Sequence, residues 1–199
     1  MTLGLPLHDE LEKALKNLRN EVKVVLIENR KKKSNNLYKK IINEVHTKAK
    51  DKIKSLSLPL NKAKDYDIPS TPALIIYGIF NGRLRFIGLM DELMEYMVKL
   101  SIAYAGKGLE LKDATKIVKT SRLTIDLYVV PGIPCLKTLK ALLPLPACHN
   151  IILNVIDVRE NKELAVRYPG SGLPLTVVRE SNYVKRGIIS DISQVIKKH

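Results

Sequence analysis

Apolar and polar positions along the second half of the chain predict short strands that alternate with helices. Residues 127–130, 151–158 and 175–178 are runs of apolar and β-branched side chains, a pattern typical of buried strands. Helical spacing follows Pro131-Gly132 and recurs in the charged stretch at 161–168. The predicted order is therefore strand, helix, strand, helix, proline and strand, with a last helix near the C-terminus.

The first half shows the same kinds of element. Apolar residues recur with helical spacing over residues 9–20, which predicts an amphipathic helix. Asn81-Gly82 lies between two apolar runs and predicts a hairpin. A further helix is expected to begin at Ser34 or Asn35, either of which could cap it. The other expected elements are strands at 22–27, 73–79 and 83–87 and a helix at 91–103.

The segment between the halves contains Ala105-Gly106-Lys107-Gly108, which has the composition of a phosphate-binding loop. It follows a helix and lacks the Walker spacing, so we interpret it as a helix end and a turn. A linker helix is expected at 109–118. These signals place two units at residues 1–106 and 107–199.

Composition limits the class of protein. The 199 residues are 45% hydrophobic, enough for one large domain or two of about 100 residues with separate cores. No run approaches the roughly 18 apolar residues of a membrane span, and the N-terminus has no signal-peptide pattern. We therefore expect a cytoplasmic protein without a membrane span. A Lys-rich and Ile-rich chain with one glutamine, Gln194, is compatible with a thermophilic source.

Cys135 is the candidate for reactive chemistry because it falls in the first turn of a predicted helix. The N–H groups at a helix start stabilise a thiolate and can lower a cysteine pKa from about 8.5 towards 7 when solvent reaches the sulfur. Cys148 lies beyond that helix, so we expect no Cys135–Cys148 disulfide, which needs Cα atoms within about 7 Å. The four histidines are scattered, and we expect no metal site and no cofactor.

Residues 125–198 resemble a thioredoxin-fold unit. The resemblance rests on the strand before Pro131-Gly132-Ile133-Pro134-Cys135, on Leu173-Pro174 leading into a strand, and on the last helix. In that family the helix start carries Cys-x-x-Cys, and the loop proline opposite it is cis. This chain has Gly132, Ile133 and Pro134 before Cys135, so the motif is degenerate.

The whole chain resembles the archaeal protein disulfide oxidoreductases, glutaredoxin-like proteins with two thioredoxin folds in tandem. The first half carries this resemblance in residues 70–73, Ser-Thr-Pro-Ala, and 85–89, Arg-Phe-Ile-Gly-Leu. The resemblance implies an α/β fold of two tandem thioredoxin-like units, each a mixed central sheet flanked by helices. It also implies disulfide exchange with protein clients. The corresponding site in the first half, residues 29–34, has no cysteine.

Cys135 corresponds to the second, resolving cysteine of the family motif. A thiol at that position is covered by neighbouring side chains, so we expect its pKa to stay high and its chemistry to be weak or lost. A catalyst that uses Cys135 as a single thiol remains the alternative.

Two prolines suggest a binding surface that needs no cysteine. A cis X-Pro bond before a strand turns main-chain groups outward, where an extended peptide could pair with them. We expect cis at Pro174, with Leu173 before it, and weigh cis and trans equally for Pro72, which follows Thr71. Ordinary trans prolines at strand starts are the alternative.

The net charge of +14 is concentrated between residues 30 and 54, where ten Lys and Arg residues face two acidic ones. Arg30, Lys31, Lys32 and Lys33 are the candidate anion-binding residues, for an acidic partner or nucleic acid. The alternative is a solvated face, because only Tyr38 offers a stacking aromatic ring within this stretch. Three functions remain open: a disulfide oxidoreductase of reduced capability, a redox-silent peptide-binding module, and an anion or nucleic-acid binder.

Overall fold

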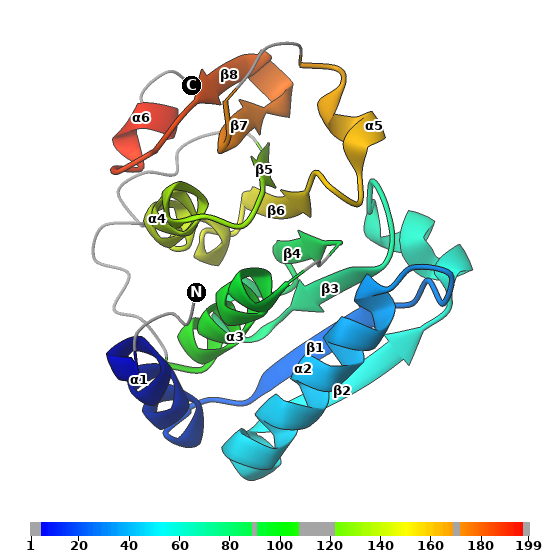
Figure 1. The fold of residues 1–199 in the computed structure, drawn as a ribbon, viewed down its shortest axis with the longest axis vertical. Coiled ribbons are helices and arrows are strands. Elements are labelled where there is room, and N and C mark those ends of the chain that lie inside the picture. The colour runs from blue at the N-terminus through cyan, green and yellow to red at the C-terminus, as the bar shows by residue number, and fades with distance from the viewer. Residues whose placement is uncertain (1–4, 89–90, 108–121, 169–171, 197–199) are drawn as a thin grey trace.

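The structure is a computed structural model that describes residues 5–88, 91–107, 122–168 and 172–196 (Figure 1). One mixed sheet runs through it, in the strand order β2-β1-β3-β4-β6-β5-β7-β8. Its strands are β1 Val22–Ile27, β2 Ile53–Leu58, β3 Ala73–Ile76, β4 Leu84–Ile87, β5 Leu123–Val129, β6 Ile151–Asp157, β7 Leu175–Val178 and β8 Tyr183–Arg186.

Each half of the chain contributes four strands with the same pairing. β1 is parallel to β2 and antiparallel to β3, and β5 is parallel to β6 and antiparallel to β7. The halves join where β4 pairs in parallel with β6, from Leu84 opposite Leu153 to Ile87 opposite Ile156. The sheet is therefore continuous across the whole chain, and the division at 106/107 stays a prediction.

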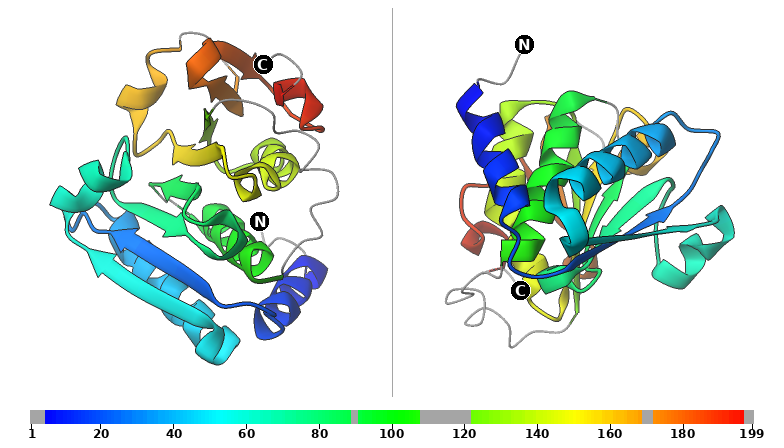
Figure 2. Two further views of the ribbon diagram at one scale, coloured as in Figure 1. Left: turned by 180° about the vertical axis from the view of Figure 1, so that it is seen from behind. Right: turned by 90° about the horizontal axis from the view of Figure 1, so that it is seen from below.

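The α-helices are α1 Leu5–Lys16, α2 Ser34–Ala49, α3 Glu92–Lys107, α4 Ile133–Leu142, α5 Lys162–Ala165 and α6 Ser193–Ile196. Short 3-10 turns are η1 Lys50–Lys52, η2 Leu60–Tyr66, η3 Gly78–Phe80, η4 Leu145–Ala147 and η5 Arg179–Ser181. The two faces of the sheet are covered unequally (Figure 2). Side chains of α1, α2, α3 and α4 belong to the large core on one face, whereas residues of η2 and α5 pack on the other.

The large core contains residues from both halves. Met94, Val98 and Ile102 of α3 belong to the same buried cluster as Leu127 of β5 and Leu139 of α4. Burying a side chain of this size contributes about 1.5–3 kcal/mol. The halves consequently share a hydrophobic core as well as a sheet.

Helix α3 extends past the expected helix end, because Gly106 lies within it. Residues Ala105, Gly106 and Lys107 continue α3, and the Gly106 carbonyl accepts hydrogen bonds from the N–H groups of Arg19 and Asn20. A Cβ at Gly106 would lie 2.7 Å from Leu18 Cδ2. This glycine thus permits close packing against the segment after α1, and the expected linker helix at 109–118 lies outside the described residues.

Other element limits also differ from the sequence expectations. β3 ends at Ile76 because the η3 turn follows, and α5 is shorter than 161–168. Ser34 and Asn35 lie inside α2 and do not cap it; their side chains bond to Glu160 and to the Asn29 N–H. β2 was not identified, since exposed Lys54, Ser55 and Ser57 interrupt its apolar pattern.

Candidate functional site

The degenerate motif lies where the sequence predicted it, at the start of a helix after an internal strand. β5 ends at Val129, the chain turns through Val130 to Gly132, and α4 begins at Ile133 with Pro134 in its first turn. β5 is flanked by β6 and β7, so the sheet holds this turn from both sides. Cys135 is the third residue of α4.

Cys135 is buried, with 2% of its surface exposed, and belongs to the large core. Burial raises the pKa of its thiol; a hydrogen bond from the Val130 main chain lowers it in part, and the Asp157 carboxylate raises it further. Cys148 is also buried and forms no disulfide, and burial raises the pKa of its thiol. Both sulfurs are therefore held mainly as neutral thiols at neutral pH.

Gly132 occupies the outward position of the same turn and is half-buried. Its backbone is extended, with φ 166° and ψ 152°, a conformation that any residue can adopt. A Cβ there would meet only Pro134 Cδ, at 3.6 Å. The site consequently has room for a side chain at residue 132, and it exposes Ile133, at 50%, and Pro134.

The Leu173-Pro174 loop lies beside this turn because β5 and β7 pair up to Tyr128 opposite Leu175. The Leu173–Pro174 and Thr71–Pro72 peptide bonds are both cis. Pro174 is buried, and half-buried Leu173 packs against two apolar clusters. Within the described part of the chain, no hydrogen bond reaches the Leu173 main chain. A surface of Ile133, Pro134 and Leu173 thus borders the thiol position, and we call it the α4 surface.

The equivalent turn of the first half, after β1, is a polar loop without sulfur. The Asn29 N–H donates to Asn35 Oδ1 at 2.9 Å, and Asn29 Nδ2 donates to Thr71 Oγ1 at 3.2 Å. These bonds fix the loop to α2 and to the Thr71-Pro72 segment. Pro72 and Thr71 are buried, so this loop lacks the apolar exposure of the α4 surface.

The four candidate anion-binding residues do not converge on one point. Arg30 Nε pairs with Glu28 Oε2 at 3.1 Å, while Lys32 Nζ donates to the Glu160 carbonyl and to Asn161 Oδ1 in the second half. Lys31 and Lys33 are exposed. Further along, Lys39, Lys40, Lys48 and Lys54 pair with Glu28, Glu95, Glu12 and Glu21. Acidic residues from other elements therefore neutralise much of the basic segment.

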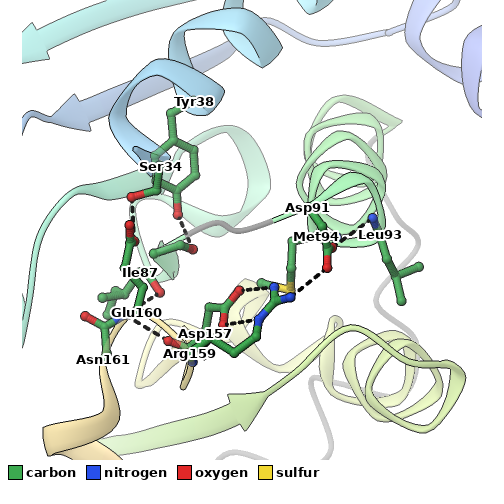
Figure 3. A network of polar contacts seen from close by, with 11 residues as sticks. Ser34, Tyr38, Ile87, Asp91, Leu93, Met94, Asp157, Arg159, Glu160 and Asn161 are labelled. Carbon is green, nitrogen blue, oxygen red and sulfur yellow. Dashed lines mark hydrogen bonds and ion pairs between the residues drawn. The ribbon is translucent and has the colours of Figure 1, made fainter. Parts of the chain in front are cut away.

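A polar network at the junction of the halves was not found from the sequence (Figure 3). Ser34 Oγ donates to Glu160 Oε2, and Tyr38 Oη donates to the Gly88 carbonyl at 2.9 Å. Arg159 donates to both carboxylate oxygens of buried Asp157 and to Asp91 Oδ2. Burial raises the pKa of Tyr38 well above its ordinary value. The available sequence signal was the polar run from Asp157 to Asn161 directly after a strand.

A second buried carboxylate lies on the thinly covered face of the sheet. Asp126 accepts from Arg179 Nε at 2.7 Å, from Arg179 Nη2 at 2.9 Å and from Asn154 Nδ2 at 2.8 Å. An open cavity of about 310 Å³ adjoins it, lined in part by Tyr128, Arg167 and Tyr168. Both oxygens of Asp126 already have partners, so the pair serves to hold β5, β6 and η5 together.

The described residues contain no group of three or more His, Cys, Asp and Glu side chains arranged to hold a metal ion. Among the same residues, no helix has the length and apolar character needed to cross a membrane.

Comparison with solved structures finds chains of the same fold. The alkylhydroperoxide reductase AhpF from Enterococcus faecalis matches with a TM-score of 0.81 and 13% identity, over 100% of this chain and 99% of that one. A protein disulfide oxidoreductase from Aeropyrum pernix matches with a TM-score of 0.73 and 16% identity, over 94% and 88%. A Sulfolobus solfataricus protein matches with a TM-score of 0.58 and 12% identity, over 89% and 96%.

No protein-family model matches the sequence, and no curated protein matches it either. At these identities the likeness establishes the fold: an α/β chain of two tandem thioredoxin-like units built on a mixed eight-stranded sheet. The expected fold class is thereby confirmed.

Proposed function

We propose that this chain is a thioredoxin-like protein of the disulfide-oxidoreductase type whose thiol–disulfide chemistry is weak or lost. The observation that carries this proposal is the contrast at the start of α4. The outward position, Gly132, has no sulfur, and the inward position holds Cys135 with 2% exposure and a raised pKa.

Disulfide exchange needs two steps that this arrangement supports poorly. An exposed thiolate first attacks one sulfur of a client disulfide, which breaks the S–S bond, forms a mixed disulfide and releases the other sulfur as a thiolate. A neighbouring thiolate then attacks the mixed disulfide and releases the reduced client. Residue 132 cannot begin the first step, and buried Cys135 has no partner sulfur for the second.

The test is reduction of insulin by dithiothreitol with catalytic amounts of protein. The wild-type chain should add little to the rate with dithiothreitol alone, whereas Gly132→Cys should accelerate it because the new thiol is at the outward helix start. Gly132→Ser is the matched control, similar in size and without sulfur, and should stay inactive. When dithiothreitol is removed before insulin is added, reduced Gly132→Cys/Cys135→Ser should accumulate the mixed disulfide, since the resolving thiol is missing and no external thiol replaces it.

A wild-type rate comparable to that of a dithiol thioredoxin would contradict the proposal. So would a folded Gly132→Cys protein that neither forms the 132–135 disulfide under mild oxidation nor reduces insulin.

The α4 surface favours a second candidate, a redox-silent module that binds extended segments of proteins. Exposed Ile133 and Pro134 offer an apolar contact, and beside them lies Leu173, whose main chain has no hydrogen-bond partner among the described residues and could pair with a strand. We expect a carboxymethylated, unfolded client to bind equally well to wild type and to Cys135→Ser/Cys148→Ser. Ile133→Lys should weaken it about tenfold. Ile188→Lys, at a similarly exposed isoleucine, is the control and should leave binding unchanged.

A further inference from the structure

Strand β2 leaves one edge of the sheet open. Among the described strands it pairs only with β1, and it lies at the end of the sheet opposite β8 (Figures 1 and 2). Residues 54–57 are exposed, including Leu56, whose exposed fraction is 41%. An edge strand presents a row of main-chain N–H and C=O groups with which another extended chain can pair. β2 is therefore a template for strand addition.

An open cleft continues this edge past the C-terminal ends of β1 and β2. It has a volume of about 560 Å³, and its walls are residues 28–31 on one side and 57–60 on the other. The Glu28 N–H donates to the Leu58 carbonyl at 2.8 Å, which joins the two walls at the base. Leu58, Pro59 and exposed Leu60 make the second wall largely apolar.

The first wall of the cleft carries an excess of positive charge. Glu28 is its carboxylate, and both of its oxygens are engaged, by Arg30 Nε at 3.1 Å and by Lys39 Nζ at 2.9 Å. These cations hold the pKa of Glu28 below its ordinary value, the Lys39 hydrogen bond contributing most. The Arg30 side chain is nevertheless 86% exposed, and Lys31 is exposed beside it. Three cations, Arg30, Lys31 and Lys39, thus stand against the one carboxylate of Glu28, so an approaching anionic group would meet a net positive charge.

The charge also decides between two occupants of this edge. A second copy of the chain would bring the same net charge of +14 to the contact. Like charges brought together in this way oppose association. An acidic segment of another protein is favoured by the same charges.

We propose that β2 and the adjoining cleft bind an extended acidic segment of a partner protein, added to the sheet as a ninth strand. An apolar side chain of that segment lies beside Leu56, and a carboxylate reaches Arg30 and Lys31. Leu56 and Leu58 share one face of β2 and are about 7 Å apart. Apolar residues at alternate positions of the segment would therefore lie on the face of Leu56 and Leu58. The acidic residues between them would continue along the edge to the cleft. This site lies in the first half and does not depend on Cys135 or the α4 surface.

The probe is a short, fluorescently labelled peptide of β-branched residues that alternate with acidic ones, titrated against the full chain. Leu56→Glu should weaken its binding about tenfold, because it removes the apolar contact and places a negative charge beside the acidic peptide on the edge strand. Val184→Glu is the matched control, since Val184 is 39% exposed on the opposite edge strand β8, and it should not change binding. Arg30→Glu/Lys31→Glu should also weaken binding about tenfold, and exposed Lys137→Glu on α4 should not.

The second part of the test changes the sequence of the peptide. A version with proline at alternate positions cannot donate the ladder hydrogen bonds and should bind at least tenfold more weakly, as should a lysine-rich version. Equal binding of the proline version, no binding of the acidic peptide to wild type, or an equal loss in Val184→Glu would each overturn the proposal. So would a dimer that Leu56→Glu converts to monomer without a change in peptide binding, because the edge would then join two copies.

Ile133→Lys separates this proposal from the proposed function. It should leave binding of the acidic peptide unchanged, because residue 133 lies on α4 in the other half of the sheet. Loss of acidic-peptide binding in Ile133→Lys would place the peptide on the α4 surface and overturn the assignment to β2.

Discussion

At the scale of single residues, the fold places both cysteines away from solvent. Cys135 and Cys148 are both buried and neither forms a disulfide, and burial raises the pKa of both thiols. Gly132 stands at the start of α4, where a Cβ would meet only Pro134 Cδ, at 3.6 Å. A buried thiol with a raised pKa and an accessible position without sulfur therefore lie three residues apart.

The first residue-scale prediction concerns the rate at which Cys135 reacts with a thiol reagent. In Cys148→Ser, labelling should be slow at pH 7 and should accelerate only above about pH 8.5, the ordinary cysteine value, because the thiolate is scarce below it. Cys135→Ser reports Cys148 in the same way, and the denatured chains give the intrinsic rates. Fast labelling of folded Cys148→Ser at pH 6 would support the single-thiol catalyst instead.

At the scale of elements, the short η3 turn approaches helix α3 closely. Gly78 of η3 has φ +78°, and a Cβ on it would lie 2.8 Å from the Ala105 carbonyl oxygen of α3. Gly187, after β8, has a similar φ of +83° and nothing within 4 Å of the added Cβ. An alanine at residue 187 would therefore meet only the cost of the left-handed backbone conformation. An alanine at residue 78 would meet the same cost and also the crowding against α3.

The element-scale prediction is that Gly78→Ala destabilises the protein more than Gly187→Ala does. Gly187→Ala should lower the free energy of unfolding by about 1 kcal/mol, the usual cost of a left-handed conformation for a residue with a Cβ. Gly78→Ala should cost a further 1–3 kcal/mol or so, because α3 must shift away from η3. Urea unfolding of both variants measures the difference, and equal losses would show that η3 and α3 are not so closely packed.

At the scale of the whole molecule, the two halves are joined by a sheet, a core and a polar network. β4 pairs with β6, the large core takes side chains from both halves, and Arg159 links Asp157 of β6 to Asp91 near α3. Asp157 is fully buried, and Arg159 donates hydrogen bonds to both of its carboxylate oxygens. We therefore expect the halves to unfold together.

The whole-molecule prediction is that Arg159→Leu lowers the free energy of unfolding by about 3–5 kcal/mol, because it leaves the Asp157 carboxylate buried without its cation. Adding Asp157→Asn should recover part of the loss. Arg122→Leu, which removes an exposed ion pair to Asp67, is the control and should cost about 1 kcal/mol or less. Two separate thermal transitions in the wild type would contradict the expectation of joint unfolding.

The sequence by itself determined most of the order of elements, with β2 missed, and the hairpin at Asn81-Gly82. These features follow from periods of two and 3.6 residues and from turn residues, which act over a few neighbouring positions. The resemblance supplied the expected burial of Cys135 and the fold class, since element order and the Leu173-Pro174 step are local patterns. Sequence reasoning placed the helix end wrongly at Gly106, because the close approach of Leu18 is a distance that no local pattern records.

The tertiary structure alone decided which distant residues meet. Ser34 and Glu160 are 126 positions apart and Lys32 and Asn161 are 129 apart, yet each pair is hydrogen-bonded across the junction. Glu28, Glu95, Glu12 and Glu21 neutralise lysines and an arginine that look like one basic patch in the sequence. Charges act through space, and the pairing of β4 with β6 sets which side chains are neighbours across the junction. The sequence therefore shows which residues are charged, whereas the fold decides which of them are paired within the protein.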